Sequence, residues 1–159
     1  MRRFRPSAIV SRTGFTLARR TVRRFGYLDI TWDLDVRAQI SSWVDRPSGR
    51  DIRGGLEAAL DEYVKLRNEV PDAQWVGDTR EIGVISQEDQ DWINNDWFPR
   101  LLETGVRYMA VVAPRSVIAK MAVESIVTRV EGTALTTNYV ETIDEGLEWI
   151  ASCLARRDD

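Results

Sequence analysis

The chain has 159 residues, of which 43% are hydrophobic and 30% charged, and its formal net charge is −3. These values fit one soluble globular domain, and the longest apolar run is shorter than the roughly 20 residues that a membrane span needs. The absence of His and the single Cys153 exclude Ser-His-Asp and Cys-His catalytic groups, zinc sites built on His or four Cys, and an internal disulfide. We therefore expect a non-enzymatic cytoplasmic protein without a metal or cofactor, in which Cys153 is a small buried hydrophobe.

The charge is distributed unevenly along the chain. Residues 1–25 hold eight Arg and no acid, whereas residues 26–159 hold 14 basic and all 25 acidic residues, so the two parts carry +8 and −11. This pattern predicts a basic leader over 1–25, a domain over 26–155 and a short tail over 156–159. The leader is open to several interpretations: a disordered or loosely helical arm, an extension from a misplaced start codon, an organelle presequence, or an arm that touches anionic lipid or nucleic acid. It could also contact the acidic domain; the domain itself is not expected to bind nucleic acid.

Hydrophobic periodicity predicts the elements of the domain. Leu28, Ile30 and Trp32 alternate with polar residues, which is typical of a half-buried strand. The remaining predicted elements are a strand over 36–44, a helix over 51–67, a strand over 73–78, a helix from Ser86 to Gly105, a strand over 107–114, a helix over 115–130, a strand over 134–140 and a last helix after Thr142. Pro99 predicts a kink or break at Phe98.

This order predicts an α/β domain with a mainly parallel five-stranded sheet, an N-terminal antiparallel hairpin and four helices. Trp92 and Trp97 are interpreted as core or interface residues. In the helix over 115–130, five apolar residues are expected to face the core: Ile118, Met121, Ala122, Ile126 and Val130.

The central segment resembles a known family. The residues that carry the resemblance are Trp75, Asp78, Thr79, Arg80, Val84, Ile85, Ser86, Glu88, Asp89, Gln90, Trp92, Trp97, Phe98, Pro99 and Arg100. Residues 27–154 as a whole are similar to small bacterial STAS/SEC14-type proteins with a SpoIIAA-like fold, most of which are uncharacterised. The resemblance implies a single STAS-like domain with a regulatory or protein-binding role.

Candidate site residues gather at the carboxyl ends of two predicted strands, where α/β sheets usually bind ligands. Asp78, Thr79 and Arg80 follow one strand, and Arg115 and Ser116 follow the next. In a functional interpretation, Arg80 contacts an anion or partner and Asp78 orients it. In a structural interpretation, Asp78 caps the loop and pairs with Arg80.

Ser86 is a candidate for two roles. Followed by Asp89, it matches a helix N-cap in a variant of the capping box. In anti-sigma-factor antagonists, better-known relatives of that fold, a Ser at this structural position is phosphorylated, so the resemblance implies phosphorylation of Ser86. The chain lacks their Asp-Ser-Ser-Gly type of motif, and Glu88 and Asp89 would repel a phosphate.

Three classes of function remain open. The first is a regulatory or protein-interaction module with a protein partner, which could include a homodimer. The second is a carrier or sensor of a lipid or other apolar small molecule, which predicts a cavity of some hundreds of Å³. The third is an enzyme that works with Asp, Glu, Arg and Ser alone, which predicts a carboxylate of raised pKa in a cleft.

Overall fold

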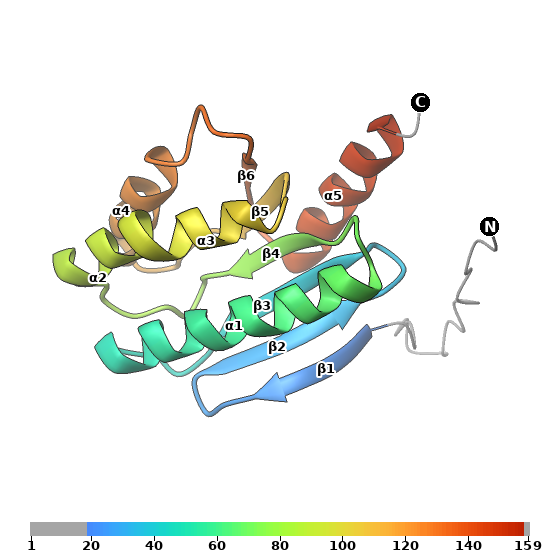
Figure 1. Cartoon of the computed structure of the whole chain (residues 1–159). Coiled ribbons are helices and arrows are strands. Elements are labelled where there is room, and N and C mark those ends of the chain that lie inside the picture. Colours follow the sequence, from blue (N-terminus) through green and yellow to red (C-terminus); the bar gives the residue numbers. More distant parts are fainter. Residues whose placement is uncertain (1–18, 158–159) are drawn as a thin grey trace.

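The computed structural model describes residues 19–157 as a six-stranded sheet with helices on both faces (Figure 1). The strands are β1 (Arg19–Arg24), β2 (Leu28–Asp33), β3 (Ala38–Trp43), β4 (Gln74–Asp78), β5 (Tyr108–Val112) and β6 (Thr136–Val140). The helices are α1 (Gly49–Glu69), a second helix made of α2 (Gln87–Trp92), η1 (Ile93–Trp97) and α3 (Phe98–Glu103), then α4 (Val117–Thr128) and α5 (Ile143–Arg157). The α/β class, the antiparallel hairpin and the four helices are as predicted.

The strands lie in the sheet in the order in which they occur in the chain. β1, β2 and β3 pair antiparallel, and β3 to β6 pair parallel. Right-handed crossovers that all step in one direction place their helices on the same face, and α1, the second helix and α4 do share one buried cluster. Among the helices of residues 19–157, α5 alone covers the other face, where it packs against Ile40, Val76 and Ala110. The face covered by α1, the second helix and α4 is therefore the more deeply buried of the two, and we call it the deeper face.

The sheet has six strands rather than the predicted five, because Arg19–Arg24 forms β1. The predicted boundary at residue 25 is thus wrong for this segment, which pairs antiparallel with β2 through a bulge at Val22. Its Arg-rich sequence has no alternating apolar pattern, but the open edge of β2 supplies hydrogen-bond partners that the pattern does not reveal. Residues 1–18 of the predicted leader lie outside the described residues, as do 158 and 159 of the predicted tail; residues 156 and 157 belong to α5.

Acidic residues of the domain neutralise much of the charge of β1. Four ion pairs join them: Arg19 Nε with Asp33 Oδ2 at 3.4 Å, Arg19 Nη2 with Asp144 Oδ1 at 3.6 Å, Arg23 Nη1 with Glu62 Oε1 at 3.8 Å, and Arg24 Nε with Asp29 Oδ1 at 3.2 Å. The guanidinium of Arg20 lies over the ring of Trp32, 5.3 Å from its centroid. This part of the basic segment therefore contacts the acidic domain within one chain. Charged side chains and a bulge also protect an edge strand from pairing with other chains.

The second helix passes Pro99 without a break. A proline within an α-helix clashes with the carbonyl four residues earlier. Here the five residues Ile93–Trp97, which precede Phe98 and Pro99, form a π-helical turn. The backbone N–H of Phe98 donates to the carbonyl of Ile93, one residue further back than in an α-helix. The irregularity predicted at Phe98 is therefore a π-turn. The helix ends at Glu103, and Gly105, with a φ of +88°, closes it as expected.

The predicted inward face of α4 is partly wrong. Ala122, Ile126 and Val130 are buried, but Ile118 and Met121 are 66% and 67% exposed. Residues 117–123 are apolar on nearly every side of the helix, so their periodicity does not specify which side packs against the sheet. The predictions for Trp97 and Cys153 are confirmed, because both are buried, and Trp92 is half-buried. No helix within residues 19–157 has the length and apolar character needed to cross a membrane.

Candidate functional site

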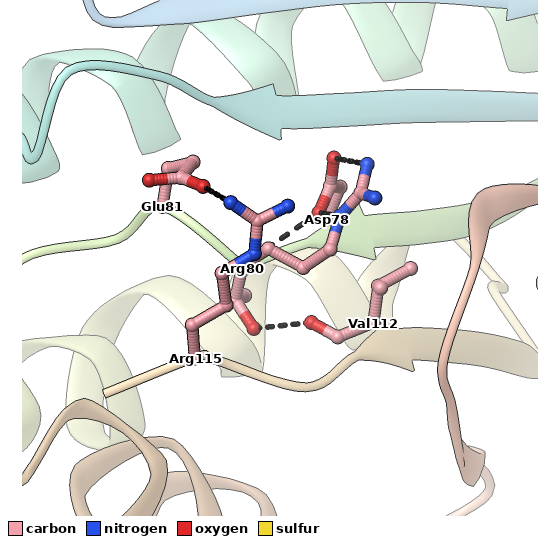
Figure 2. A network of polar contacts seen from close by, with 6 residues as sticks. Asp78, Arg80, Glu81, Val112 and Arg115 are labelled. Carbon is pink, nitrogen blue, oxygen red and sulfur yellow. Dashed lines mark hydrogen bonds and ion pairs between the residues drawn. The ribbon is translucent and has the colours of Figure 1, made fainter. Parts of the chain in front are cut away.

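Asp78 and Arg80 form a closed ion pair at the carboxyl end of β4 (Figure 2). The guanidinium of Arg80 donates from Nε to Asp78 Oδ1 and from Nη2 to Oδ2, both at 2.9 Å. The backbone N–H of Arg80 also donates to Oδ1, at 3.2 Å. Asp78 is 5% exposed, so its carboxylate both caps the turn and neutralises the arginine. This geometry is the one described by the structural interpretation of the motif.

The loops after β4 and β5 are joined directly. Thr79 donates from its hydroxyl to the carbonyl of Val112 at 2.6 Å, and the backbone N–H of Arg115 donates to the carbonyl of Arg80 at 3.2 Å. The guanidinium of Arg115 pairs with Glu81, as Figure 2 shows. The sequence-predicted residues of this edge are thus brought together, as expected from adjacent parallel strands.

The charges at this edge are satisfied within the chain. Hydrogen bonding to Asp78, opposed in part by burial, raises the pKa of Arg80 above its ordinary value. Arg115 is exposed, but Glu81 accompanies it. A cation that already holds a carboxylate must lose that partner before it binds an anion. The edge therefore lacks a preformed anion site at Arg80 and Arg115.

Ser86 and Ser116 are both helix N-caps. The backbone N–H of Asp89 donates to Ser86 Oγ at 3.1 Å, and that of Ala119 donates to Ser116 Oγ at 3.4 Å. The predicted cap at Ser86 is confirmed. Asp89 is itself buried and pairs with Arg53 at 2.7 Å. Ser86 is exposed, so phosphorylation stays a prediction that the geometry neither blocks nor requires.

An apolar surface lies on the first turns of α4, beside this edge. Val117, Ile118 and Met121 are 73%, 66% and 67% exposed. We call these three residues the α4 surface. Val84, which is 68% exposed, lies in the loop that Glu81 ties to Arg115. This surface was missed in the sequence because Ile118 and Met121 were assigned to the core.

A cavity of about 90 Å³ lies between the sheet and the three helices on the deeper face. Its walls include Ser41 on β3, Trp75 and Gly77 on β4, Met109 on β5, Ile82 in the following loop and Trp97 in η1. The aromatic rings of Tyr63, Trp75, Trp97 and Phe98 form a chain of edge-to-face contacts beside it. Ligand pockets for drug-sized molecules measure about 300–1,000 Å³, so this cavity is below the size predicted for a lipid carrier.

Two features that an enzyme without His could use can be checked in the described residues: a metal site and a carboxylate of raised pKa in a cleft. No group of three or more His, Cys, Asp and Glu side chains within 19–157 could hold a metal ion. Among the described carboxylates, Asp35 has a raised pKa, through some loss of hydration and the nearby charge of Asp33. It is exposed in the turn between β2 and β3 and does not line the cavity. Comparison with protein-family models, with curated proteins and with solved structures finds no match.

Proposed function

We propose that the chain is a non-enzymatic regulatory module of the STAS type that binds a protein partner through the α4 surface. The observation that carries the proposal is the exposure of Val117, Ile118 and Met121, each by about two thirds, on one end of a helix. Adjacent apolar side chains left open to water mark interaction sites more often than single exposed residues do.

The chemistry around the α4 surface favours an apolar partner. Its charged neighbours are paired with opposite charges, Arg115 with Glu81 and Lys120 with Glu124 at 4.0 Å. The surface is therefore close to neutral, and neither a nucleic acid nor an acidic or basic peptide is selected by charge. A protein that presents an apolar helix or strand face matches it best.

The extent of the surface favours a transient complex. Three partly exposed side chains offer a few hundred Å² at most, whereas a stable interface buries roughly 800 Å² on each partner. A permanent homodimer through these residues alone would fall below that area. Binding and release of a separate protein is the behaviour expected of a regulatory module.

Photo-crosslinking in the native cell tests the proposal. A photoreactive amino acid at Ile118 should give one discrete product whose mass is that of this chain plus another protein, and Met121→Asp should abolish it. The same amino acid at Glu148, an exposed position of α5 on the opposite side of the sheet, is the matched control. Equal products from both positions, or a product that survives Met121→Asp, would refute the proposed surface; a product of twice the chain's mass would replace the separate partner by a second copy.

A further inference from the structure

We infer that the cavity on the deeper face is a binding site for a small neutral molecule that combines an apolar body with one oxygen acceptor. The inference is independent of the α4 surface. It depends on two polar groups that face the same empty space and on the absence of charge around them.

The first group is the hydroxyl of Ser41. Ser41 is 3% exposed and lines the cavity, and its Oγ has no hydrogen-bond partner within the described residues. A buried hydroxyl without a partner carries a desolvation cost, so such groups are few in folded proteins. A ligand that hydrogen-bonds to Ser41 would remove that cost.

The second group is the indole N–H of Trp75, and Gly77 brings the two together. Ser41 and Gly77 are paired across β3 and β4. A Cβ built on Gly77 would lie 3.6 Å from Trp75 Nε1, so the indole nitrogen lies over the same glycine. The space left by the missing side chain of Gly77 is thus flanked by a hydroxyl and an N–H donor. Within residues 19–157, Trp75 Nε1 donates no hydrogen bond.

The rest of the wall excludes charged ligands. None of the described residues that line the cavity is charged, and the other hydroxyl in the wall, that of Thr79, already donates to Val112. An ion would lose its hydration there without compensation. A single oxygen that accepts from both Ser41 and Trp75 satisfies both donors at once.

The volume sets the size of the ligand. About 90 Å³ is several times the roughly 10–15 Å³ of cavity that one water needs and smaller than the roughly 150 Å³ of an engineered benzene cavity. The cavity therefore suits a ketone, alcohol or ether of about four to seven non-hydrogen atoms. A lipid chain is too large unless the wall moves.

Cyclopentanone and methylenecyclopentane form a matched pair of probes, because they share a shape and only the first has an acceptor oxygen. Titration of the full chain is followed by the indole ¹⁵N–¹H resonance of Trp75, assigned with Trp75→Phe. We expect cyclopentanone to move this resonance downfield and to bind more tightly than the hydrocarbon. Equal affinity for the two, or a shift confined to other tryptophans, would overturn the inference. The inference would also be overturned if the ketone did not bind and the indole N–H of Trp75 contacted only water.

Three substitutions separate a binding role from a structural one. Ser41→Ala should weaken cyclopentanone roughly five- to tenfold and leave the melting temperature of the free protein unchanged or higher, because it removes an unsatisfied hydroxyl. Gly77→Ala should fill the space without a clash and abolish binding. Ser42→Ala, on the opposite face of β3, is the control and should change neither. A lower melting temperature for Ser41→Ala would mean that the hydroxyl has a structural partner and would refute its assignment to a ligand.

Discussion

Asp78 accepts three hydrogen bonds from Arg80, one from its backbone N–H and two from its guanidinium. The pair turns the chain where β4 ends and neutralises a carboxylate that is 5% exposed. The two partners differ in exposure, because about a third of the Arg80 side chain is exposed whereas Asp78 is buried. Loss of the arginine should therefore cost more than its exposure alone suggests.

Arg80→Ala is expected to lower the free energy of unfolding by about 2–3 kcal/mol. The substitution leaves the buried Asp78 without its cation, which in a fully buried pair costs about 3–5 kcal/mol, and solvent screening of the exposed arginine reduces that figure. Arg115→Ala breaks the exposed pair with Glu81 and should cost less than about 1 kcal/mol. Urea denaturation of both variants gives the comparison; equal losses would contradict the structural role of Asp78.

Ser86→Ala should lower the free energy of unfolding by about 1 kcal/mol through loss of the N-cap. Ser86→Asp should restore most of the loss, since an acid at that position also accepts from a backbone N–H at the helix start. Ser116→Ala is expected to cost less than Ser86→Ala, because its hydrogen bond is 3.4 Å long against 3.1 Å. Thermal and urea unfolding of the three variants test the ranking, and a larger loss at Ser116 would reverse it.

Tyr63 should make the fold sensitive to alkaline pH. Burial raises the pKa of its phenol well above the ordinary value of 10.0, and its hydroxyl donates to the carbonyl of Ala73 at 2.5 Å. Because the folded pKa lies above the unfolded one, the contribution of Tyr63 to stability is fully present below about pH 10 and is lost as the pH rises above it. The free energy of unfolding of the native chain should therefore be lower at about pH 11 than at about pH 8, as chemical denaturation at the two pH values would measure.

Tyr63→Phe separates this effect from general alkaline denaturation. The variant should lose about 1 kcal/mol at about pH 8, where the hydrogen bond to Ala73 is intact in the native chain. Its stability should then fall less between the two pH values, since Phe does not ionise. Tyr139→Phe is the matched comparison, because partial burial and the charges of Glu124 and Glu131 raise the pKa of Tyr139 to about 12 while its ring remains 42% exposed. A pH dependence of Tyr63→Phe identical to that of the native chain would show that other groups control it.

Removal of β1 should destabilise the domain. A chain that begins at Gly26 leaves β2 as an edge and deprives the nearly buried Asp33 of Arg19, and it should unfold at lower urea concentration than a chain that begins at Arg19. It should also aggregate more readily, because an unprotected strand edge pairs with other chains. Light scattering and urea unfolding of the two chains test this, and equal behaviour would mean that β1 contributes little to the fold.

The parts of the fold that depend on local patterns were predictable from the sequence. Alternation at Leu28, Ile30 and Trp32, and the cap at Ser86, involve residues close together in the chain. β1 was not predictable in this way, because its hydrogen bonds come from β2 and its charges are neutralised by acids elsewhere. The exposure of Ile118 and Met121 depends on which side of an almost uniformly apolar helix meets the sheet.

The same distinction between local sequence patterns and tertiary packing applies to the candidate site. The order of the strands was sufficient to bring Asp78, Arg80 and Arg115 to one edge. The space over Gly77 was not predictable, because it depends on how three helices pack and on the orientation of Trp75. A glycine and a serine on neighbouring strands carry no signal of a cavity until the register that pairs them is known.

The strand order has a consequence for synthesis of the chain. Since each strand pairs with the one made just before it, the sheet can grow in the order in which the ribosome releases it, and each crossover closes only a short loop. The face that contains Ile40, Val76 and Ala110 is covered by α5, the last element described. Until that helix emerges, a nascent chain presents a complete but half-covered sheet. Premature termination before Ile143 should therefore yield a product that holds its strands together and yet exposes a continuous apolar face to chaperones and proteases.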